Sequence, residues 1–288
     1  MTIGSTALRP KPVRRARGLR SGARRQDVAV MLGVVTTVAA SALVVPVGTT
    51  TAQAAALVPV ASYSVADLTE RVGTATERRV IGRSVEGRKI VAWRYGPATA
   101  TRTAVVIGQM HGNETGGIPI TKRLQQLGAP GTTAMWIIKT LSPDALVRHQ
   151  RKNARGVDIN RNGSDLWKGT ARAPDYYPGP SALSEPETRA YVSFLDAISP
   201  DLVLIYHQAA NGVDSYHAKD MGLVNGLARR MRMPVQSFNC DGECTGTLTG
   251  WFNKTHSGTA LTIELPASVN STKVKRWTSA ARWAIKSG

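Results

Sequence analysis

The sequence predicts a single α/β domain in which helices cover both faces of a mixed, mostly parallel central sheet. Two patterns carry this prediction. Apolar runs of strand length, such as residues 103–109 and 134–140, alternate with longer segments of helical periodicity, such as residues 115–127. The apolar runs lack the polar alternation of a half-exposed strand, so both faces of the sheet should be buried. Strands that alternate with helices are typical of a sheet with a helical layer on either side.

Spacing and turn residues place the individual elements. The helix over residues 115–127 should end at Gly128. The helix over residues 184–198 should have Ser184 as its cap and Pro186 in its first turn. The predicted strands cover residues 79–81, 89–95, 103–109, 134–140, 201–207 and 260–265, and the further predicted helices cover residues 64–72, 221–231 and 273–286.

The start of the chain, residues 1–54, is predicted to be a cleaved secretion signal. Eight basic residues and one acid within residues 1–27 precede a nearly uncharged stretch at residues 28–47, and small residues ending in Ala54-Ala55-Ala56 follow. A basic segment, an apolar segment and an A-x-A site are typical of such a signal. An uncleaved membrane anchor is the alternative, but Pro46 and the A-x-A site favour cleavage.

The remainder of the chain divides into a linker at residues 55–62 and a folded domain at residues 63–288. We expect a secreted protein of the bacterial cell envelope, exported by the general secretory route or, if Arg24-Arg25 is a twin-arginine pair, by that route. The expected state is a monomer with no stable membrane insertion after cleavage.

The chain is strongly basic, with a formal net charge of +18 over 288 residues. Such charge attracts a protein to anionic surfaces, including wall polymers and phospholipid head groups. The basic residues after residue 56 are scattered and match no nucleic-acid motif, so nucleic acid is not an expected partner. General surface charge and solubility explain them more simply.

The two cysteines, Cys240 and Cys244, are a disulfide candidate in an oxidising compartment. The bridge would enclose three residues and stiffen one local loop. A structural zinc site is not expected, because the sequence has no second cysteine pair.

Four residues at or near the ends of predicted strands suggest a metal centre. His111 follows a buried strand and has Glu114 three residues later, while His207 and Glu264 lie at the ends of two further apolar runs. In α/β sheets, ligands gather at the carboxyl ends of the strands. A catalytic zinc has three protein ligands and an open position, so these residues predict a zinc hydrolase.

Ordinary roles remain open for several of these side chains. A carboxylate in an apolar strand, such as Glu264, is costly unless it is paired or functional. It is either bonded to a neighbouring arginine or acts as a general base. His149 and His256 lie in polar, loop-like sequence and are expected to be structural or surface residues, and His217 stays undecided.

A polar cluster at residues 151–162, RKNARGVDINRN, lies within a long stretch, residues 142–181, that has little periodicity. A loop of that length in a compact domain is usually functional. Arginine binds a carboxylate through two parallel hydrogen bonds, and an arginine near a metal can stabilise an oxyanion. Taken alone, the cluster is more simply a solvated charged loop.

Together these motifs resemble the zinc metallocarboxypeptidase family of the carboxypeptidase A and B type. The shared order is HGNE at residues 111–114, RKNARGVDINRN at 151–162, LVLIYH ending at residue 207, and TIELP around residue 264. The short chain and the segments SVEGR (84–88) and SEPET (184–188) are similar to small bacterial members that resemble murein peptide amidase. The resemblance implies a zinc carboxypeptidase-like fold and a catalytic domain at residues 63–288.

The resemblance also implies a metal site and a base. One zinc ion per chain would be bound by His111, Glu114 and His207. Glu264 would deprotonate a zinc-bound water and then protonate the leaving amine.

It further implies how substrate binds. Arg151 would polarise the scissile carbonyl, and Asn160 and Arg161 would hold the terminal carboxylate. The implied function is a secreted zinc carboxypeptidase that hydrolyses a C-terminal peptide or γ-glutamyl amide bond. Peptidoglycan stem peptides are a candidate substrate.

One stretch departs from the family pattern. The animal enzymes have a mobile tyrosine before the stretch that lines the specificity pocket, but this chain has no tyrosine at the corresponding position, near Cys240 or Asp241. Leu248 aligns with the pocket residue. We hypothesise that Asp241 and Glu243 bind the ammonium group of lysine or diaminopimelate, with a solvated turn as the alternative.

Two other functions stay open. HGNE before an apolar helix also resembles the aspartoacylases, zinc enzymes that remove acyl groups from amino acids. A basic, non-catalytic cell-wall-binding protein on a degenerate peptidase fold is the second alternative, although every expected ligand and base position is kept.

Overall fold

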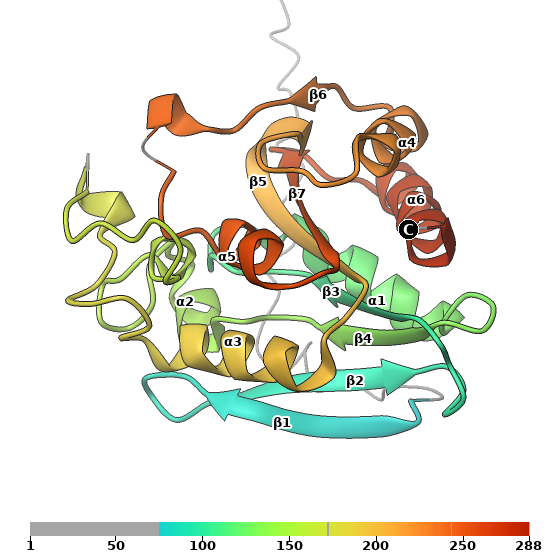
Figure 1. Cartoon of the computed structure of the whole chain (residues 1–288), viewed down its shortest axis with the longest axis horizontal. Coiled ribbons are helices and arrows are strands. Elements are labelled where there is room, and N and C mark those ends of the chain that lie inside the picture. The colour runs from blue at the N-terminus through green and yellow to red at the C-terminus, as the bar shows by residue number, and fades with distance from the viewer. Residues whose placement is uncertain (1–74, 172, 243, 288) are drawn as a thin grey trace, which may run out of the picture. The chain divides into compact units, whose positions relative to one another are not determined.

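The computed structural model describes residues 75–171, 173–242 and 244–287 (Figure 1). The predicted signal, the linker and the helix at residues 64–72 lie outside the described residues. The strands are β1 (Glu77–Arg83), β2 (Lys89–Tyr95), β3 (Thr103–Ile107), β4 (Ala134–Ile138), β5 (Leu202–Asp214), β6 (Val235–Gln236) and β7 (Thr259–Pro266). The α-helices are α1 (Ile118–Leu127), α2 (Pro143–Arg148), α3 (Pro186–Ile198), α4 (Met221–Met231), α5 (Leu248–Thr255) and α6 (Ser271–Ser287).

The strands form one seven-stranded sheet in the order β1-β2-β4-β3-β5-β6, and β7 pairs with β5. β1 with β2 and β2 with β4 are antiparallel. The pairs β3–β4, β3–β5, β5–β6 and β5–β7 are parallel. The predicted mixed, mostly parallel sheet is therefore confirmed.

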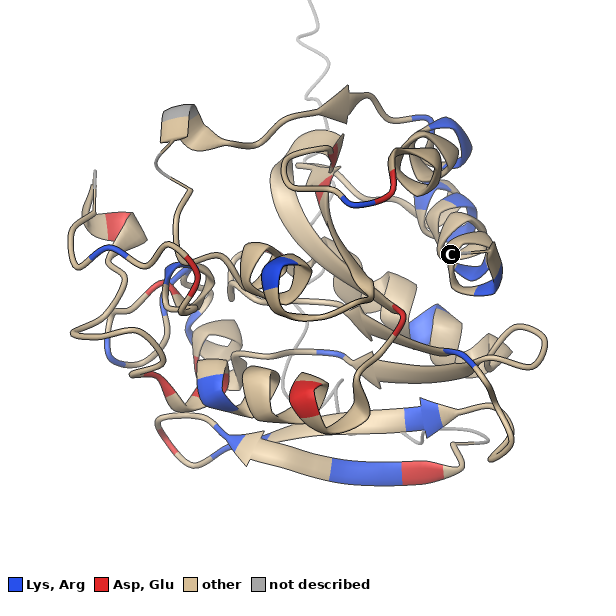
Figure 2. Ribbon diagram, in the orientation of Figure 1, with Lys and Arg blue, Asp and Glu red and all other residues tan. Residues whose placement is uncertain are grey.

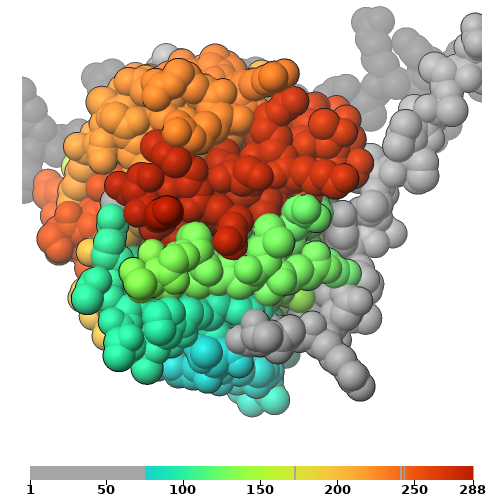
Figure 3. Space-filling model, turned by 90° about the vertical axis from the view of Figure 1, so that its right-hand side faces the viewer, coloured from blue at the N-terminus to red at the C-terminus, as the bar shows by residue number. Residues whose placement is uncertain are grey.

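Both faces of the sheet are covered because the central strands carry apolar side chains on both of their faces. In β5, Leu202, Leu204 and Tyr206 point into one core, which α1, α4 and α6 close. Val203 and Ile205 point into the other core, which α3 and α5 close. Figure 3 shows α4, α6 and α1 side by side on one side of the molecule.

The structure differs from the sequence prediction at several places, and the elements α5 and β6 were not predicted. The strand expected at residues 201–207 continues to Asp214, past an irregularity around Ala209 and Ala210. The stretch expected to be loop contains α2, which is six residues long and too short for a clear period. Glu185 rather than Ser184 occupies the cap position of α3, because the Ser184 hydroxyl instead donates to the Glu185 side chain.

The predicted scatter of basic residues holds in the described part of the chain. Figure 2 shows lysines and arginines on many elements, α4 and α6 among them. Across residues 75–171, 173–242 and 244–287, no helix combines the length and apolarity needed to cross a bilayer.

Leu204, at the centre of β5, tests the core assignment. Its side chain is fully buried, so Leu204→Ala should lower the free energy of unfolding by about 3 kcal/mol. Leu127→Ala is the matched control, because Leu127 is 48% exposed, and it should cost less than about 1 kcal/mol. Urea denaturation measures both. Equal losses for the two variants would contradict the assignment.

Candidate active site

Three neighbouring strands bring the predicted metal and base residues to one edge of the sheet. β3 ends at Ile107, shortly before His111, and β3 lies parallel to β5. His207 of β5 pairs with Glu264 of β7 in parallel register. Because these strands share a direction, their carboxyl ends meet at one edge.

The HGNE turn holds its two ligands on the same side. The Glu114 N–H donates to the His111 carbonyl at 3.0 Å, which closes the turn. Gly112 has to be glycine, because a Cβ there would collide with the backbone carbonyl of Ala145 in α2. The short helix α2 thus fixes the position of the turn.

His111, Glu114 and His207 form a buried cluster with the donor set of a zinc site. Their ligand atoms all lie within 4.8 Å of one another. The Nδ1 atoms of His111 and His207 lie 2.8 Å from the two different oxygens of Glu114. His111 Nδ1 is buried and makes no hydrogen bond within the described part of the chain. Such a nitrogen beside a carboxylate suits a metal ligand, so the residues present fit zinc.

Asp158 supports this cluster from behind. It lies 2.9 Å from His111 Nε2 through Oδ1, and its Oδ2 accepts two hydrogen bonds from Arg151, at 3.0 and 2.7 Å. A carboxylate on the far nitrogen of a ligating histidine fixes the tautomer and the ring orientation. The sequence pattern alone did not assign a role to Asp158. The one signal for it was the presence of an acid among the arginines and asparagines of residues 151–162.

The charges of the cluster stabilise one another. Burial alone would raise the pKa of Glu114, but His111 and His207 hold it well below its usual range. Burial would likewise raise the pKa of Asp158, but His111 and Arg151 outweigh that effect and lower it. Burial acts to lower the pKa of His111, yet Glu114 and Asp158 raise it overall. The site therefore keeps carboxylates charged in a buried position.

Asn160 and Arg161, two of the predicted substrate-binding residues, line the same cavity as His111 and His207 of the metal cluster. The cavity has a volume of about 260 Å³. Its lining includes His111, Arg151, Asn160, Arg161, His207 and Glu264. Arg151 also donates to Glu114 at 3.0 Å, so the expected carbonyl-polarising cation contacts a metal ligand directly.

Asn160 and Arg161 are held by the 3₁₀ turn at Ile159–Arg161 and by the loop before α5. The Asn160 side chain accepts from the Leu248 N–H at 3.1 Å. Arg161 donates to the Asn160 carbonyl at 2.8 Å and contacts Cys244 Sγ at 3.2 Å. These bonds orient the guanidinium along one wall of the cavity.

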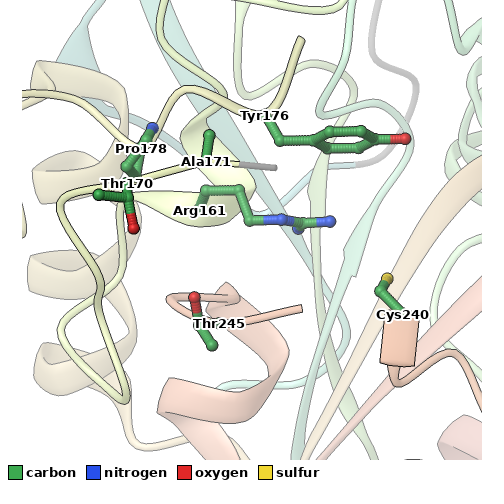
Figure 4. A pocket seen from close by; sticks show the side chains of 7 residues that line it. All are labelled: Arg161, Thr170, Ala171, Tyr176, Pro178, Cys240 and Thr245. Carbon is green, nitrogen blue, oxygen red and sulfur yellow. The ribbon is translucent and has the colours of Figure 1, made fainter. Parts of the chain in front are cut away.

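Tyr176, which the sequence did not single out, stacks on both arginines. The guanidinium carbon atoms of Arg151 and Arg161 lie 5.0 and 5.3 Å from its ring centroid. Figure 4 shows the ring above Arg161, with Cys240 opposite and Thr245 below. The ring therefore contacts both cations. Tyr176 lies in the long irregular loop, where the sequence has no periodicity that could have indicated this contact.

Glu264 lies beside the metal cluster and is partly buried. Its Oε2 accepts from the Ala210 N–H at 3.4 Å. Burial raises the pKa of this carboxyl above its ordinary value, although His207 reduces the effect. A raised pKa makes this carboxylate a stronger proton acceptor than an exposed glutamate.

The specificity loop differs from the sequence prediction in one respect. Leu248 was expected to line the pocket, but it is fully buried in the core because it begins α5 and packs toward the sheet. Thr249 and Thr262 line the cavity nearby, with their hydroxyls 2.8 Å apart. Alignment of one apolar residue could not indicate which side of the helix start faces the substrate.

The remaining predictions from the sequence have mixed outcomes. The predicted Cys240–Cys244 disulfide is confirmed, and both cysteines line the cavity. Asp241 lies in a 3₁₀ turn, and its side chain is not described. Glu243 lies outside the described residues. The ammonium-binding hypothesis for these two acids therefore stays a prediction.

The three histidines outside the metal cluster lie in different environments. His256 stacks on Phe252 with ring centroids 4.4 Å apart and lies 3.2 Å from Asp196, as expected for a structural residue. His149 is an exposed residue that ends α2. His217, undecided from the sequence, lines the cavity.

Known proteins share sequence and fold with this chain. The zinc carboxypeptidase family model matches residues 137–221. Murein peptide amidase A of Escherichia coli (strain K12) is 24% identical over 182 residues, which cover 59% of this chain and 74% of that protein. The crystal structure of murein-tripeptide amidase from Escherichia coli O157 has a TM-score of 0.60 at 20% identity, and the match covers 73% of this chain and 92% of that one.

A second solved structure extends the fold similarity to an insect enzyme. Carboxypeptidase A from Helicoverpa armigera has a TM-score of 0.64 at 19% identity, covering 78% of this chain and 72% of that one. The region matched by the family model includes the polar cluster at 151–162 and His207. Residues 137–221 therefore match a zinc carboxypeptidase domain, and the chain is similar to the murein peptide amidases in sequence and fold; together these matches indicate a peptide hydrolase.

Proposed function

We propose that this protein is a secreted zinc carboxypeptidase that hydrolyses a C-terminal peptide bond or a γ-glutamyl amide bond, with peptidoglycan stem peptides as its substrate class. The single observation that carries the proposal is one cavity lined by two of the buried metal ligands, by Glu264, and by the cations Arg151 and Arg161. Secretion is supported by the leader pattern of residues 1–54.

His111, Glu114 and His207 would hold one zinc ion per chain. Zinc, when bound, lowers the pKa of water and polarises a carbonyl as a Lewis acid. Asp158 keeps the His111 ring oriented with Nδ1 toward Glu114. These residues supply the metal site without help from a second chain.

Asn160 and Arg161, on one wall of the cavity, select substrates with a free C-terminal carboxylate. Arg161 and the Asn160 amide bind the terminal carboxylate of the substrate, because arginine pairs with carboxylates through two donors. Arg151 lies nearer the metal cluster, bonded to Glu114 and Asp158. It binds the carbonyl oxygen of the scissile bond, where negative charge develops in the transition state.

Glu264 moves the protons. It accepts the proton of the attacking water and returns it to the leaving amine. Burial raises its pKa, so the carboxylate accepts a proton more readily than an exposed glutamate does, and the leaving amine, which is the stronger base, then takes that proton.

The wall-peptide substrate is supported by the relatives and by charge. Two matched proteins are named murein peptide amidase and murein-tripeptide amidase. The leader carries eight basic residues and one acid, so eleven of the +18 formal charges remain after its removal, and they attract the protein to anionic envelope polymers. The aspartoacylase-like alternative has no observation in its favour beyond the shared motif. The non-catalytic alternative is less favoured, because the expected metal-ligand and base positions are all kept.

Zinc binding should depend on His207. The purified chain should bind close to one zinc per molecule, and His207→Ala should weaken binding by at least about 100-fold, since one of three protein ligands is lost. His149→Asn is the control, because His149 is exposed and lies outside the cluster. Competition with a zinc indicator measures both affinities. Unchanged zinc affinity in His207→Ala would contradict the assigned metal site.

Glu264→Gln keeps the shape of the side chain and removes the proton acceptor. Hydrolysis of a C-terminal residue should fall by about 10²–10⁴-fold in kcat, while zinc binding persists. Steady-state kinetics with zinc-loaded protein give the comparison. A variant as active as the wild type would rule out the proposed base.

Arg161→Ala should remove the preference for a free C-terminus. For peptides with a free carboxylate, kcat/KM should fall by about 10–100-fold, because a hydrogen bond to a charged group contributes about 1.5–3 kcal/mol. The ratio between free and amidated forms of one peptide measures this preference. Arg79→Ala, on the exposed face of β1, should leave the ratio unchanged. Retention of the wild-type ratio in Arg161→Ala would contradict the carboxylate-binding role.

A further inference from the structure

We propose that the outer side of α4 and α6 binds a linear polyanion, a flexible polyphosphodiester without bases such as an anionic cell-wall polymer. This basic face consists of Arg229, Arg232, Lys275, Arg276 and Lys286. Among the described residues, the lining of the catalytic cavity contains none of these five. The inference therefore goes beyond the proposed function, and the cavity stays open while the polymer is bound.

The helices of one layer carry cations but no acid to balance them. α1, α4 and α6 contain two, two and five lysines or arginines, and neither aspartate nor glutamate. The opposite layer differs, because α3 carries Glu187 and Asp196 beside Arg189, and Lys254 of α5 lies 3.9 Å from Asp165. Figure 2 shows blue without red along α4 and α6. The positive charge of this layer is therefore not neutralised locally.

The five side chains of the basic face also lack partners. Within residues 75–171, 173–242 and 244–287 they form no ion pair and no side-chain hydrogen bond. Four of them are exposed, and Arg276 is half-buried. Other cations of the same helices, Lys273, Arg230 and Arg282, donate to backbone carbonyl groups instead. The basic face is thus free to bind an external anion.

Helix stability does not explain the cations of α6. Its first turn contains no acid, yet Lys273, Lys275 and Arg276 lie within its first two turns. The positive end of the helix dipole disfavours cations there. Arg282 and Lys286 lie four residues apart, a spacing at which like charges repel each other. A bound anion relieves both repulsions, so the sequence of α6 suits an anionic partner better than an isolated helix.

The cations of α6 form a stripe along the helix. Lys275, Arg282 and Lys286 lie seven and four residues apart, and residues at such spacings share one side of a helix. At the rise of an α-helix the stripe is about 16 Å long. Cations spread over that length fit a chain of repeated phosphates better than they fit one small anion.

α4 places two further cations beside this stripe. Arg230 of α4 stacks on Trp283 of α6, with its guanidinium carbon 3.7 Å from the ring centroid. A Cβ at Gly226 would collide with the same ring, so the two helices lie close together. The end of α4, with Arg229 and Arg232, therefore lies beside the C-terminal half of α6 (Figure 3).

The chemistry of the basic face favours a hydrated polymer over a bilayer or a nucleic acid. On α4 and α6 the exposed large apolar side chain is Met221, at the start of α4, whereas a helix that enters a bilayer surface presents an apolar side. Trp277 is buried and Arg230 already stacks on Trp283, so α6 offers little ring surface for base stacking. Phosphate charge is then the feature that the face recognises.

Two variants that lose equal charge test the proposal. The face variant carries Arg229→Gln, Arg232→Gln, Lys275→Gln, Arg276→Gln and Lys286→Gln. The control variant loses five exposed cations of β1, β2, α3 and α5, through Arg78→Gln, Arg83→Gln, Lys89→Gln, Arg189→Gln and Lys254→Gln. Fluorescence anisotropy of end-labelled poly(glycerol phosphate) measures its affinity for the purified chain and both variants over a range of salt concentrations.

The face variant should bind the polymer at least about 10-fold more weakly. Its slope of log affinity against log salt concentration should become shallower by about 3–4, since each contact to a flexible polyphosphate contributes about 0.7. The control variant should lose far less affinity and keep the wild-type slope. Equal losses in the two variants would overturn the proposal, because net charge alone would then attract the polymer. A wild type that does not bind the polymer at low salt would overturn it as well.

Thermal unfolding separates lost binding from lost folding. The polymer should raise the Tm of the wild type, because a ligand of the folded state stabilises that state, and should leave the Tm of the face variant unchanged. Without polymer the face variant should be at least as stable as the wild type, since repelling cations are removed. A polymer-induced rise in Tm that persists in the face variant would contradict the assigned surface.

Vesicles of phosphatidylcholine and phosphatidylglycerol test the choice of partner. Binding to vesicles that is tighter than binding to the polymer, and is lost in the face variant, would overturn that choice. Hydrolysis of a short soluble peptide should be the same in the wild type and the face variant, because the cavity is lined by other residues. If neither protein hydrolyses the peptide but the wild type binds the polymer through this face, the proposed function fails and the polyanion site stands.

Discussion

The candidate site depends on one buried carboxylate, Asp158, that contacts two functional groups at once. One oxygen lies against the His111 ring and the other accepts both hydrogen bonds from Arg151. The imidazole that would bind the metal and the cation that would bind the scissile carbonyl are thereby fixed relative to each other. A fully buried carboxylate is stable only with such partners. The contacts that set the geometry of the site are therefore also the contacts that stabilise this region.

Much of this arrangement follows from the sequence, because the signals are local. Apolar runs define the strands, and strand direction alone brings His111, His207 and Glu264 to one edge. Residues that act through long-range contact were harder to predict. Tyr176 lies in an irregular loop, and the cavity residues that follow His207 lie in an extension of β5 that the apolar pattern did not indicate. Leu248 was assigned to the wrong surface, since the start of a short helix has no periodicity to orient it.

The groups proposed for catalysis and the other residues that line the cavity lie in different parts of the fold. His207 and Glu264 lie on the central strands β5 and β7, and His111 and Glu114 lie on the turn packed against α2. The end of β5, the start of α5 and the disulfide loop supply the rest of the cavity lining. Such division lets one scaffold keep its chemistry while the residue that it removes changes.

The most direct test of the central claim is the mass of the products formed from a defined wall tripeptide in water enriched in ¹⁸O, with zinc-loaded protein. Metal-assisted hydrolysis at the chain end predicts release of one C-terminal residue and one ¹⁸O atom in the new carboxyl group of the shortened peptide. Both should disappear with a chelator. An intact tripeptide, internal fragments, or chelator-resistant cleavage would contradict the account.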